Sequence, residues 1–390
     1  MNALPSRRLR AHTIAARDIV PERLFARPEA TVFWDGAVAL GEAARLEAAG
    51  PGRFGDIRRR ADALFAELDG PAPPLLGGFA FAPGFADAVW GGFGDAGFIL
   101  PRWFWRDGLL TYVGAGAPPA AELRALLEPP PEPAEPGADR IERGTRADFT
   151  ALVAAATREI RAGRAEKIVV ARRTSVWGRF DDAGVLARLP CGVTRFAFRR
   201  DRATFLGATP ERLLGKVGPV LHTEAIAGTS AAATFGDKDR AEHAPVVRAI
   251  VEGLAAAGAR AEVAPAAPRV LPDLAHLVTP IRARLGGPAH LLDVAAALHP
   301  TPAVGGTPRD AALAWIRAHE APRGWYAGAV GWFDAAGDGE LHVALRCALI
   351  GAERAILFAG AGIVAASEPD AEYDETVLKE RTLLRALGVA

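Results

Sequence analysis

Two stretches of helical periodicity each carry a pair of carboxylates spaced three residues apart. Asp239 and Glu242 form the first pair, and Glu372 and Glu375 form the second. Side chains at i and i+3 share one face of a helix, so each pair would present both carboxylates on the same side. If the two acidic faces meet, a divalent cation must offset their repulsion, and oxygen donors without a Cys/His cluster favour Mg²⁺ over zinc. The alternative is two ordinary amphipathic helices with solvated acidic faces.

Lysine is rare in this chain. Only four of the 46 basic residues are lysine, at positions 167, 216, 238 and 379, and the other 42 are arginine. A lysine retained in such a chain is a candidate for chemistry that requires loss of a proton, which arginine does not undergo. Lys167 begins an apolar strand-like run, where desolvation would lower the pKa of its amine towards that of a general base. The alternative is a lysine at a sheet edge whose ammonium group reaches solvent.

Further polar residues lie between or within strand-like segments. Glu211 follows a proline between two such segments and is a candidate general acid if it is buried, or a solvated turn residue if it is not. Arg346 lies inside an apolar strand-like run and needs a partner, for which a bidentate carboxylate is best. The Gly-rich segment 360–362 could offer backbone N–H groups to an anion, or could simply be a strand bend. His276 and His299 have apolar surroundings, in which a single histidine is more often structural.

A proline-rich segment divides the chain. Residues 128–139 contain five prolines and no hydrophobic residue larger than alanine, which predicts an extended, solvated connection. We therefore separate residues 1–140, the less motif-rich N-terminal half of the fold, from the motif-rich region 141–390, within one structural domain overall.

The regular elements are clearest in the second region. Helical periodicity predicts helices over residues 146–164, 237–258, 308–320 and 370–387. Alternating apolar residues predict a strand over 167–176 and three strands near the C-terminus that are joined by tight turns. Tight turns imply antiparallel pairing, so the predicted class is α+β, a single large domain of antiparallel sheets flanked by helices.

The composition excludes several function classes. The 46 basic residues balance 46 acidic ones, so net charge gives no reason to expect binding to nucleic acid or to an anionic membrane. The longest apolar run, residues 355–366, is too short to span a bilayer, and the N-terminus lacks the apolar core of a signal peptide. Cys191 and Cys347 are too few for a disulfide framework. We expect a soluble cytoplasmic protein.

Nine motifs together resemble the chorismate-utilising enzymes. Over residues 145–387, in the order and approximate spacing of that family, the chain contains EKIVVAR, ATPERLL, TEAIAGT, KDRAEHAPVV, HLVTPI, LHPTPAVGGTP, RGWYAGAVGW, LHVALRCA and AGAGIVAASEPDAEYDETVLK. LLGGFAFAPG and LPRWFW are similar to weaker N-terminal signatures of the same fold. The resemblance implies an anthranilate/isochorismate synthase-like α/β sandwich.

Within the family, the chain looks most like an isochorismate synthase. Ala225 stands where the lyases that make anthranilate or aminodeoxychorismate carry proline, and Ala303 stands where salicylate-forming and amino-transferring relatives carry threonine. Lys167 matches the lysine with which the isomerases and the salicylate synthases activate water and which amine-using relatives lack. Thr209 departs from the usual serine, and Tyr326 occupies a variable aromatic position. A salicylate synthase, an anthranilate or aminodeoxychorismate synthase component, and a catalytically inactive chorismate-binding protein remain the alternatives.

The resemblance also implies a role for each matching residue. Lys167 would be the base and Glu211 the acid. Glu242 and Glu375 would hold Mg²⁺ on the ring carboxylate, with Asp239 and Glu372 acting through water or from behind them. The substrate-binding residues implied are Thr229, His276, Ala303, Tyr326, Arg346, Gly360, Ala361, Gly362 and Lys379. Chorismate would be the small-molecule partner of a monomer that needs no glutamine amidotransferase subunit.

Overall fold

Two arms of antiparallel strands diverge from one long strand, β6 (Ala96–Arg106), in the computed structural model, which describes residues 9–17, 19–129, 132–230, 234–270 and 275–389. The first arm continues from β6 through β5 (Leu75–Phe79), β18 (Ala329–Phe333), β19 (Gly339–Val343), β12 (Arg212–Val217), β13 (Val220–Ser230) and β16 (Ala275–Leu285). β14 (Ala259–Val263) and β15 (Ala267–Val270) both pair with β16.

The second arm contains strands from both halves of the sequence. It runs from β6 through β3 (Ala37–Ala48), β2 (Ala30–Trp34), β10 (Thr194–Arg200), β11 (Ala203–Thr209), β20 (Cys347–Ile350), β21 (Arg354–Ile363) and β9 (Lys167–Arg179). β9 also pairs with β8 (Gly137–Arg143) and β17 (Gly306–Thr307). On the other side of β6 lie β7 (Leu109–Gly114), β1 (Leu9–Ala15) and β4 (Leu68–Asp69). Among the described strands only the β1–β4 pair is parallel.

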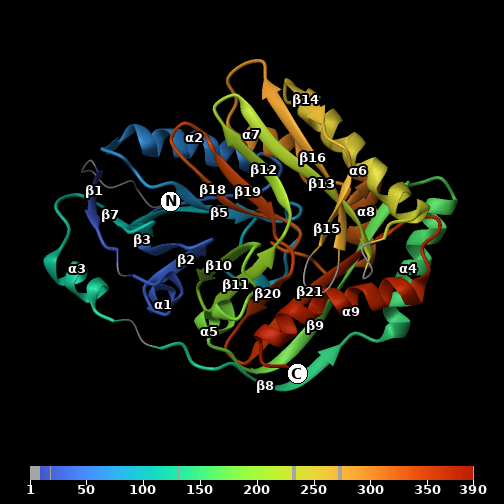
Figure 1. Cartoon of the computed structure of the whole chain (residues 1–390), viewed down its shortest axis with the longest axis horizontal. Coiled ribbons are helices and arrows are strands. Elements are labelled where there is room, and N and C mark those ends of the chain that lie inside the picture. The colour runs from blue at the N-terminus through green and yellow to red at the C-terminus, as the bar shows by residue number, and fades with distance from the viewer. Residues whose placement is uncertain (1–8, 18, 130–131, 231–233, 271–274, 390) are drawn as a thin grey trace.

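The helices pack against both arms (Figure 1). α6 (Asp237–Ala256) lies on β13, and it also contacts α7 (Leu291–Leu298), which contacts α2 (Arg53–Ala66). α9 (Pro369–Ala386) lies on β21 beside α4 (Arg146–Arg161), and α8 (Arg309–His319) packs on β9. The remaining helices are α1 (Pro21–Phe25), α3 (Ala120–Leu127), α5 (Asp182–Ala187) and the 3₁₀ turn Ala88–Trp90.

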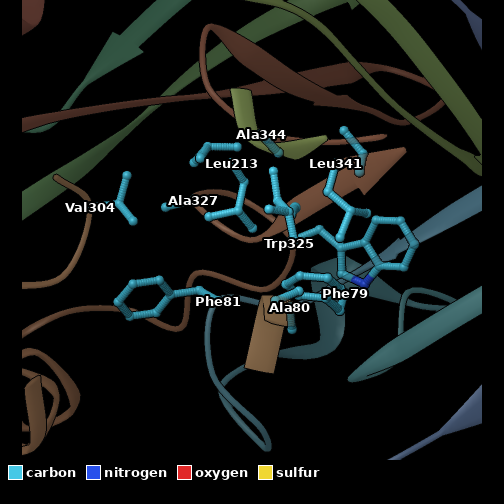
Figure 2. Close-up of a cluster of buried hydrophobic side chains, with 14 of the residues drawn as sticks. Phe79, Ala80, Phe81, Leu213, Val304, Trp325, Ala327, Leu341 and Ala344 are labelled. Atoms are coloured by element: carbon cyan, nitrogen blue, oxygen red, sulfur yellow. The ribbon is translucent and has the colours of Figure 1, made fainter. Parts of the chain in front are cut away.

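A shared core joins the two arms. The larger cluster of buried hydrophobic residues draws from strands of both, including Leu213 of the first arm and Phe205 of the second. Figure 2 shows Trp325 within this cluster, close to Phe79 and Leu341. The indole of Trp325 also packs edge-on against Phe93, with ring centroids 5.2 Å apart, and its Nε1 donates to the carbonyl of Gly94 at 2.7 Å. This packing fixes the segment that leads into β18.

The structure corrects one predicted strand. The run 340–350 is not continuous, because β19 ends at Val343, β20 begins at Cys347, and Arg346 between them has a φ of 46°. β19 pairs with β12 and β18 in the first arm, whereas β20 pairs with β11 and β21 in the second. Arg346 therefore lies where the chain crosses between the arms. The apolar pattern continues through this crossover, since both strands are buried, so the pattern alone predicts one strand.

The other predictions of elements fit the structure closely. The α+β class with antiparallel sheets is confirmed, and β9 begins at Lys167 as predicted. The observed ends of α4, α6, α8 and α9 differ from the predicted ends by at most three residues. Gly137–Arg143 forms a strand, so the end of the proline-rich segment is paired with β9 rather than free. The division near residue 140 stays a prediction. Within the described residues, no helix is both long and apolar enough to cross a bilayer.

Candidate active site

A pocket lies between the two arms, where Glu242 of α6 and Lys379 of α9 contribute to its wall. Strands of the first arm contribute Ile226–Gly228 and His276, and the turn before β12 contributes Pro210 and Glu211. Strands of the second arm contribute Val169 and residues 358–360 and 362. The wall is completed by residues from helices and connecting segments: Glu242, Ala303, Val304, Tyr326, Leu345, Arg346 and Lys379.

Lys167 is enclosed at the edge of this pocket. Its side chain is 0% exposed, which rules out the alternative of a lysine that reaches solvent at a sheet edge. Its Nζ donates to Oε1 of Glu242 at 3.0 Å and lies 3.4 Å from the carbonyl oxygen of the same residue. β9 therefore brings an amine into contact with α6, and Glu242 faces the pocket directly.

Glu211 is the carboxyl group whose chemistry the pocket alters most clearly. The residue is only 5% exposed, and burial, together with the negative charge of Glu224, raises the pKa of its carboxyl to about 8. The cations Arg346, Lys167 and Lys379 act in the opposite direction but do not offset the burial. At neutral pH this carboxyl therefore holds a proton that it can donate.

Thr209 and Val343 hold the backbone on one side of Glu211. The hydroxyl of Thr209 donates to the carbonyl of Val343 at 2.6 Å and accepts from the backbone N–H of Glu211 at 3.3 Å. The backbone N–H of Val343 donates to the carbonyl of Glu211 at 3.0 Å. Threonine keeps the hydroxyl that serine would supply, so this departure from the family pattern preserves the hydrogen bonds.

Half-buried Arg346 and buried His276 form a pair. Nη2 of Arg346 lies 3.0 Å from Nε2 of His276, while Nδ1 of His276 lies 3.2 Å from the carbonyl of Gly228. A guanidinium only donates, so Nε2 is the acceptor and Nδ1 carries the proton that is donated to Gly228. Burial, and next the charge of Arg346, holds the pKa of His276 well below its usual value. The neutral imidazole thus orients the guanidinium at the crossover between the arms.

Lys379 and the glycines of β21 form another side of the pocket. Nζ of Lys379 donates to the carbonyl of Gly360 at 2.9 Å and to Oε1 of Glu375 at 2.6 Å. A Cβ at Gly360 would lie 2.8 Å from the hydroxyl of Tyr326, and a Cβ at Gly362 would lie 2.2 Å from Oε1 of Glu242. Glycine is therefore required here for space.

The segment 360–362 forms a strand, which fits the alternative stated above, and the role predicted for its backbone N–H groups stays a prediction. All three residues are paired with β9, from Gly360 opposite Ala171 to Gly362 opposite Val169. Successive residues of a strand face opposite sides. Ala361 accordingly points into the core and is fully buried there, whereas Gly360 and Gly362 line the pocket.

A residue that sequence reasoning missed builds the wall opposite α6. Arg323 is 2% exposed and pairs with Glu320 through Nε and Nη2, both at 2.9 Å. Its Nη1 donates to the carbonyl of Val304 at 2.8 Å, and its Nη2 donates to that of Val169 at 2.8 Å. One guanidinium thus ties together the segments that present Ala303, Tyr326 and the start of β9. The arginine stands in the RGWYAG motif, but Val304 and Val169 lie 19 and 154 positions away in sequence.

The remaining predicted residues lie around the pocket or away from it. Thr229 pairs with His276 between β13 and β16, and its side chain lies outside what the structure describes. Asp239 accepts from the N–H of Gly236 at 2.9 Å and so caps the start of α6. Glu372 is buried on α9. His299 is structural: it bonds the carbonyl of Phe81 at 3.0 Å, and burial lowers its pKa to about 3.

The donor chemistry fits Mg²⁺, although the four predicted carboxylates do not form a ready-made cluster. Among the residues that the structure describes, no three His, Cys, Asp or Glu side chains gather closely enough to hold a metal ion. Glu242 and Glu375 instead each bind a lysine, at 3.0 and 2.6 Å. Both carry hard carboxylate oxygens: Glu242 lines the pocket, and Glu375 binds Lys379, which lines it. These two residues are the donors that fit such an ion.

The chain belongs to the family of chorismate binding enzymes, whose sequence profile matches residues 120–388. It is 38% identical to the salicylate biosynthesis isochorismate synthase of Pseudomonas aeruginosa, over 93% of this chain and 84% of that protein. It is 31% identical to the isochorismate synthase MenF of Bacillus subtilis, over 81% of this chain and 75% of that protein. The predicted family is therefore confirmed.

Solved structures agree with the fold. The menaquinone-specific isochorismate synthase MenF of Escherichia coli superposes with a TM-score of 0.82 at 27% identity, covering 98% of this chain and 95% of that one. Anthranilate synthase component I from Streptococcus pneumoniae, at 19% identity, has a TM-score of 0.68 over 98% of this chain and 93% of its own, and shows the fold alone.

Proposed function

We propose that this protein is an isochorismate synthase, an isomerase that converts chorismate to isochorismate by attack of water at C2 and loss of the C4 hydroxyl. The observation that carries the proposal is the meeting of a buried amine and a buried, proton-holding carboxyl at one pocket, together with a guanidinium. Lys167, Glu211 and Arg346 supply these three groups. The names of the relatives described above support the same activity.

The reaction needs a proton acceptor and a proton donor at the same time. Water forms a bond from its oxygen to C2 and gives a proton to Nζ of Lys167, which must be neutral to accept it. The double bonds of the ring shift, the C4–O bond breaks, and the departing hydroxyl takes the proton of Glu211. The raised pKa of Glu211 suits this role, because the group is still protonated near pH 7. Substrate and product are isomers, and transfer of one proton from Lys167 back to Glu211 restores both groups.

Cationic groups of the pocket suit the two carboxylates of chorismate. Arg346, oriented by His276, can bind the enolpyruvyl carboxylate in a bidentate manner, with the hydroxyl of Tyr326 nearby. Burial raises the pKa of the Tyr326 phenol, and the charge of Arg323 lowers it by less. The hydroxyl therefore keeps its proton and can act as a donor.

Glu242 and Glu375 would hold Mg²⁺ in this enzyme. When bound, the ion supplies positive charge to the ring carboxylate and stabilises the charge that shifts through the ring. The chain's own contribution is to present two carboxylates from α6 and α9 at one pocket and to keep Lys167 and Lys379 beside them. Asp239 helps indirectly, since it fixes the start of the helix that carries Glu242.

A product assay tests the proposal. Purified protein is incubated with chorismate and Mg²⁺, and the products are separated by liquid chromatography. Isochorismate as the product supports the proposal. Salicylate with equimolar pyruvate would identify a salicylate synthase, and anthranilate formed in the presence of ammonia would identify an amine-transferring relative. Absence of turnover with bound chorismate would identify a binding protein and overturn the proposal.

Several finer expectations accompany this function. We expect the enzyme to act as a monomer in the cytoplasm, without a glutamine amidotransferase subunit. Its product would serve menaquinone, siderophore or salicylate biosynthesis, in keeping with the names of its relatives. The division into residues 1–140 and a chorismate-binding region 141–390 belongs to the same proposal.

A further inference from the structure

An ion pair lies behind the turn that carries Glu211. Nη1 and Nη2 of Arg269 donate to Oε1 and Oε2 of Glu224 at 2.9 and 2.6 Å. Nη1 of Arg269 also donates to the carbonyl of Pro210 at 3.1 Å, and the backbone N–H of Arg212 donates to Oε1 of Glu224 at 3.2 Å. One bidentate pair therefore contacts the residue before Glu211 and the residue after it.

The two partners come from strands that flank the pocket. Glu224 lies on β13 opposite Pro280 of β16, and Arg269 lies on β15 opposite His276 of β16. The side chain of Glu224 is 12% exposed and that of Arg269 is 38% exposed. Both line a second cavity, whose wall also includes Thr209 and Pro210, the two residues before Glu211. The turn that carries Glu211 thus separates the active-site pocket from this outer cavity, and the ion pair holds the turn from the outer side.

The backbone at this turn needs such a restraint. The pairing of β12 with β19 shifts register between Arg212 and Leu214, so a bulge follows Glu211 immediately. A bulge interrupts the regular ladder of hydrogen bonds that would otherwise fix a strand. On the inner side, Thr209 and Val343 bind the turn, as described above. On the outer side, the ion pair binds the carbonyl of Pro210 and the backbone N–H of Arg212.

We propose that Glu224 and Arg269 are positioning residues for the general acid Glu211, which they hold in place through the backbone on both sides. This inference rests on the proposed function. The groups that face Glu211 are Glu224 on β13, Arg269 on β15, Arg346 at the crossover, Lys167 on β9 and Lys379 on α9. Of these, Glu224 carries the negative charge and opposes loss of the proton.

The alternative is a pair that only braces β13 against β15. Such a brace would contribute to the free energy of unfolding, and its removal would leave the pH dependence of catalysis unchanged. A positioning pair differs in two respects. Its removal changes kcat more than KM. In addition, the charge of Glu224 influences the pH at which kcat declines as Glu211 loses its proton.

The test is the pH profile of kcat for isochorismate formation in Glu224→Gln and Arg269→Gln. In Glu224→Gln the decline of kcat should move to lower pH by roughly half a unit or more, because the opposing charge is gone. In Arg269→Gln the loss of a cation should move the decline to higher pH. In both variants kcat should fall, by about tenfold, with a smaller change in KM.

Glu340→Gln is the matched control. Glu340 accepts from Nε of the Arg212 side chain at 2.7 Å. Unlike the Glu224–Arg269 pair, this contact involves the side chain of Arg212 and not the backbone beside Glu211. Its removal should lower the thermal stability without moving the pH profile. If Glu224→Gln does not fold, Glu224→Asp and Arg269→Gln decide the question. Glu224→Asp keeps the charge, so kcat should fall while the pH at which kcat declines stays unchanged.

Two results are distinguishable from each other. Unchanged profiles and unchanged kcat in folded Glu224→Gln and Arg269→Gln would overturn the positioning role and leave the isochorismate synthase assignment intact. Absence of isochorismate formation by the unmodified protein would instead overturn the proposed function, and with it the role of this pair.

Discussion

Nζ of Lys167 lies 3.0 Å from Oε1 of Glu242, so the residue proposed as the base contacts a residue proposed to bind the metal. Gly362 makes this contact possible, since a Cβ at that position would lie 2.8 Å from Cε of Lys167 and 2.2 Å from Oε1 of Glu242. The contact joins β9 of the second arm to α6, which packs on the first. In the proposed mechanism, water activation and cation binding would therefore depend on two side chains in direct contact.

Lys167→Ala should abolish turnover and leave chorismate binding largely intact. The side chain is the proposed acceptor of the proton from water, whereas Arg346 and Lys379 supply the charges for binding. Loss of a general base lowers kcat by about 10² to 10⁴-fold. Steady-state kinetics measure the loss, and calorimetric titration with chorismate measures binding.

Lys216→Ala is the control for this variant. Lys216 is also buried and forms an ion pair, with Asp338, but it lines a different cavity. Its removal should lower the stability with little effect on kcat. A near-normal rate for Lys167→Ala would remove Lys167 from the role of base.

Glu211→Gln should be inactive and yet more stable than the unmodified protein near neutral pH. The pKa of Glu211 is raised from 4.5 to about 8 in the folded state, so its favourable contribution to stability is complete below pH 4.5 and is lost as the pH rises through about 8. Near pH 7 the resulting penalty is on the order of 3 kcal/mol, which glutamine does not incur. Thermal unfolding of both proteins at about pH 4.5 and pH 8 measures the difference.

Glu340 is the matched control for the pH dependence of stability, because its pKa is lowered whereas that of Glu211 is raised. Hydrogen bonds and charge from His342 and Arg212 outweigh burial and lower the pKa of Glu340 to about 2, so its contribution is present above pH 4.5 and is lost as the pH falls through about 2. Glu340→Gln should therefore be less stable near pH 7. In the unmodified enzyme, kcat should decline as the pH rises through about 8. A difference in stability between Glu211→Gln and the unmodified protein that does not grow with pH would contradict the assignment.

Local sequence patterns were sufficient for residue types and for most elements, but not for contacts across the two arms. The carboxylates of α6 and α9 and the start of β9 at Lys167 follow from periodicity within one segment. The partnership of Arg346 with His276 does not, because it joins residues 70 positions apart. The same holds for Arg323 and for the Glu224–Arg269 pair, each of which acts on backbone groups of distant segments.

The glycines of β21 illustrate the same limit. A Gly-rich pattern indicates that backbone or side chains approach closely, but not which groups do so. Here the space beside Gly360 holds the Tyr326 hydroxyl, and the space beside Gly362 holds the Glu242 carboxylate. The alternation that turns Ala361 into the core depends on the pairing with β9, which is a tertiary contact.

Glu242→Gln should raise the Mg²⁺ concentration needed for activity by roughly tenfold or more, because a neutral amide binds Mg²⁺ more weakly than a carboxylate. The variant should also be less stable, since the fully buried amine of Lys167 loses the carboxylate that accepts its hydrogen bond. Activity measured across a Mg²⁺ titration gives the first quantity, and thermal unfolding gives the second.

Glu252→Gln provides the comparison on the same helix. Glu252 is exposed on α6, so its replacement should change neither the Mg²⁺ titration nor the unfolding temperature. A Mg²⁺ titration of Glu242→Gln that coincides with that of Glu252→Gln would reject the metal assignment.

Ala303→Thr should increase the release of pyruvate relative to isochorismate. Ala303 lines the pocket beside Val304, in the segment that Arg323 holds. Threonine is the residue that the pyruvate-eliminating relatives are expected to carry there, and its hydroxyl would add a hydrogen-bonding group at the pocket wall. Ala303→Val separates the two effects of the change, because valine has the shape of threonine without the hydroxyl. Pyruvate, measured with a coupled dehydrogenase, should rise in Ala303→Thr alone; equal release by both variants would assign the effect to volume, and no increase in either would remove this position from the control of elimination.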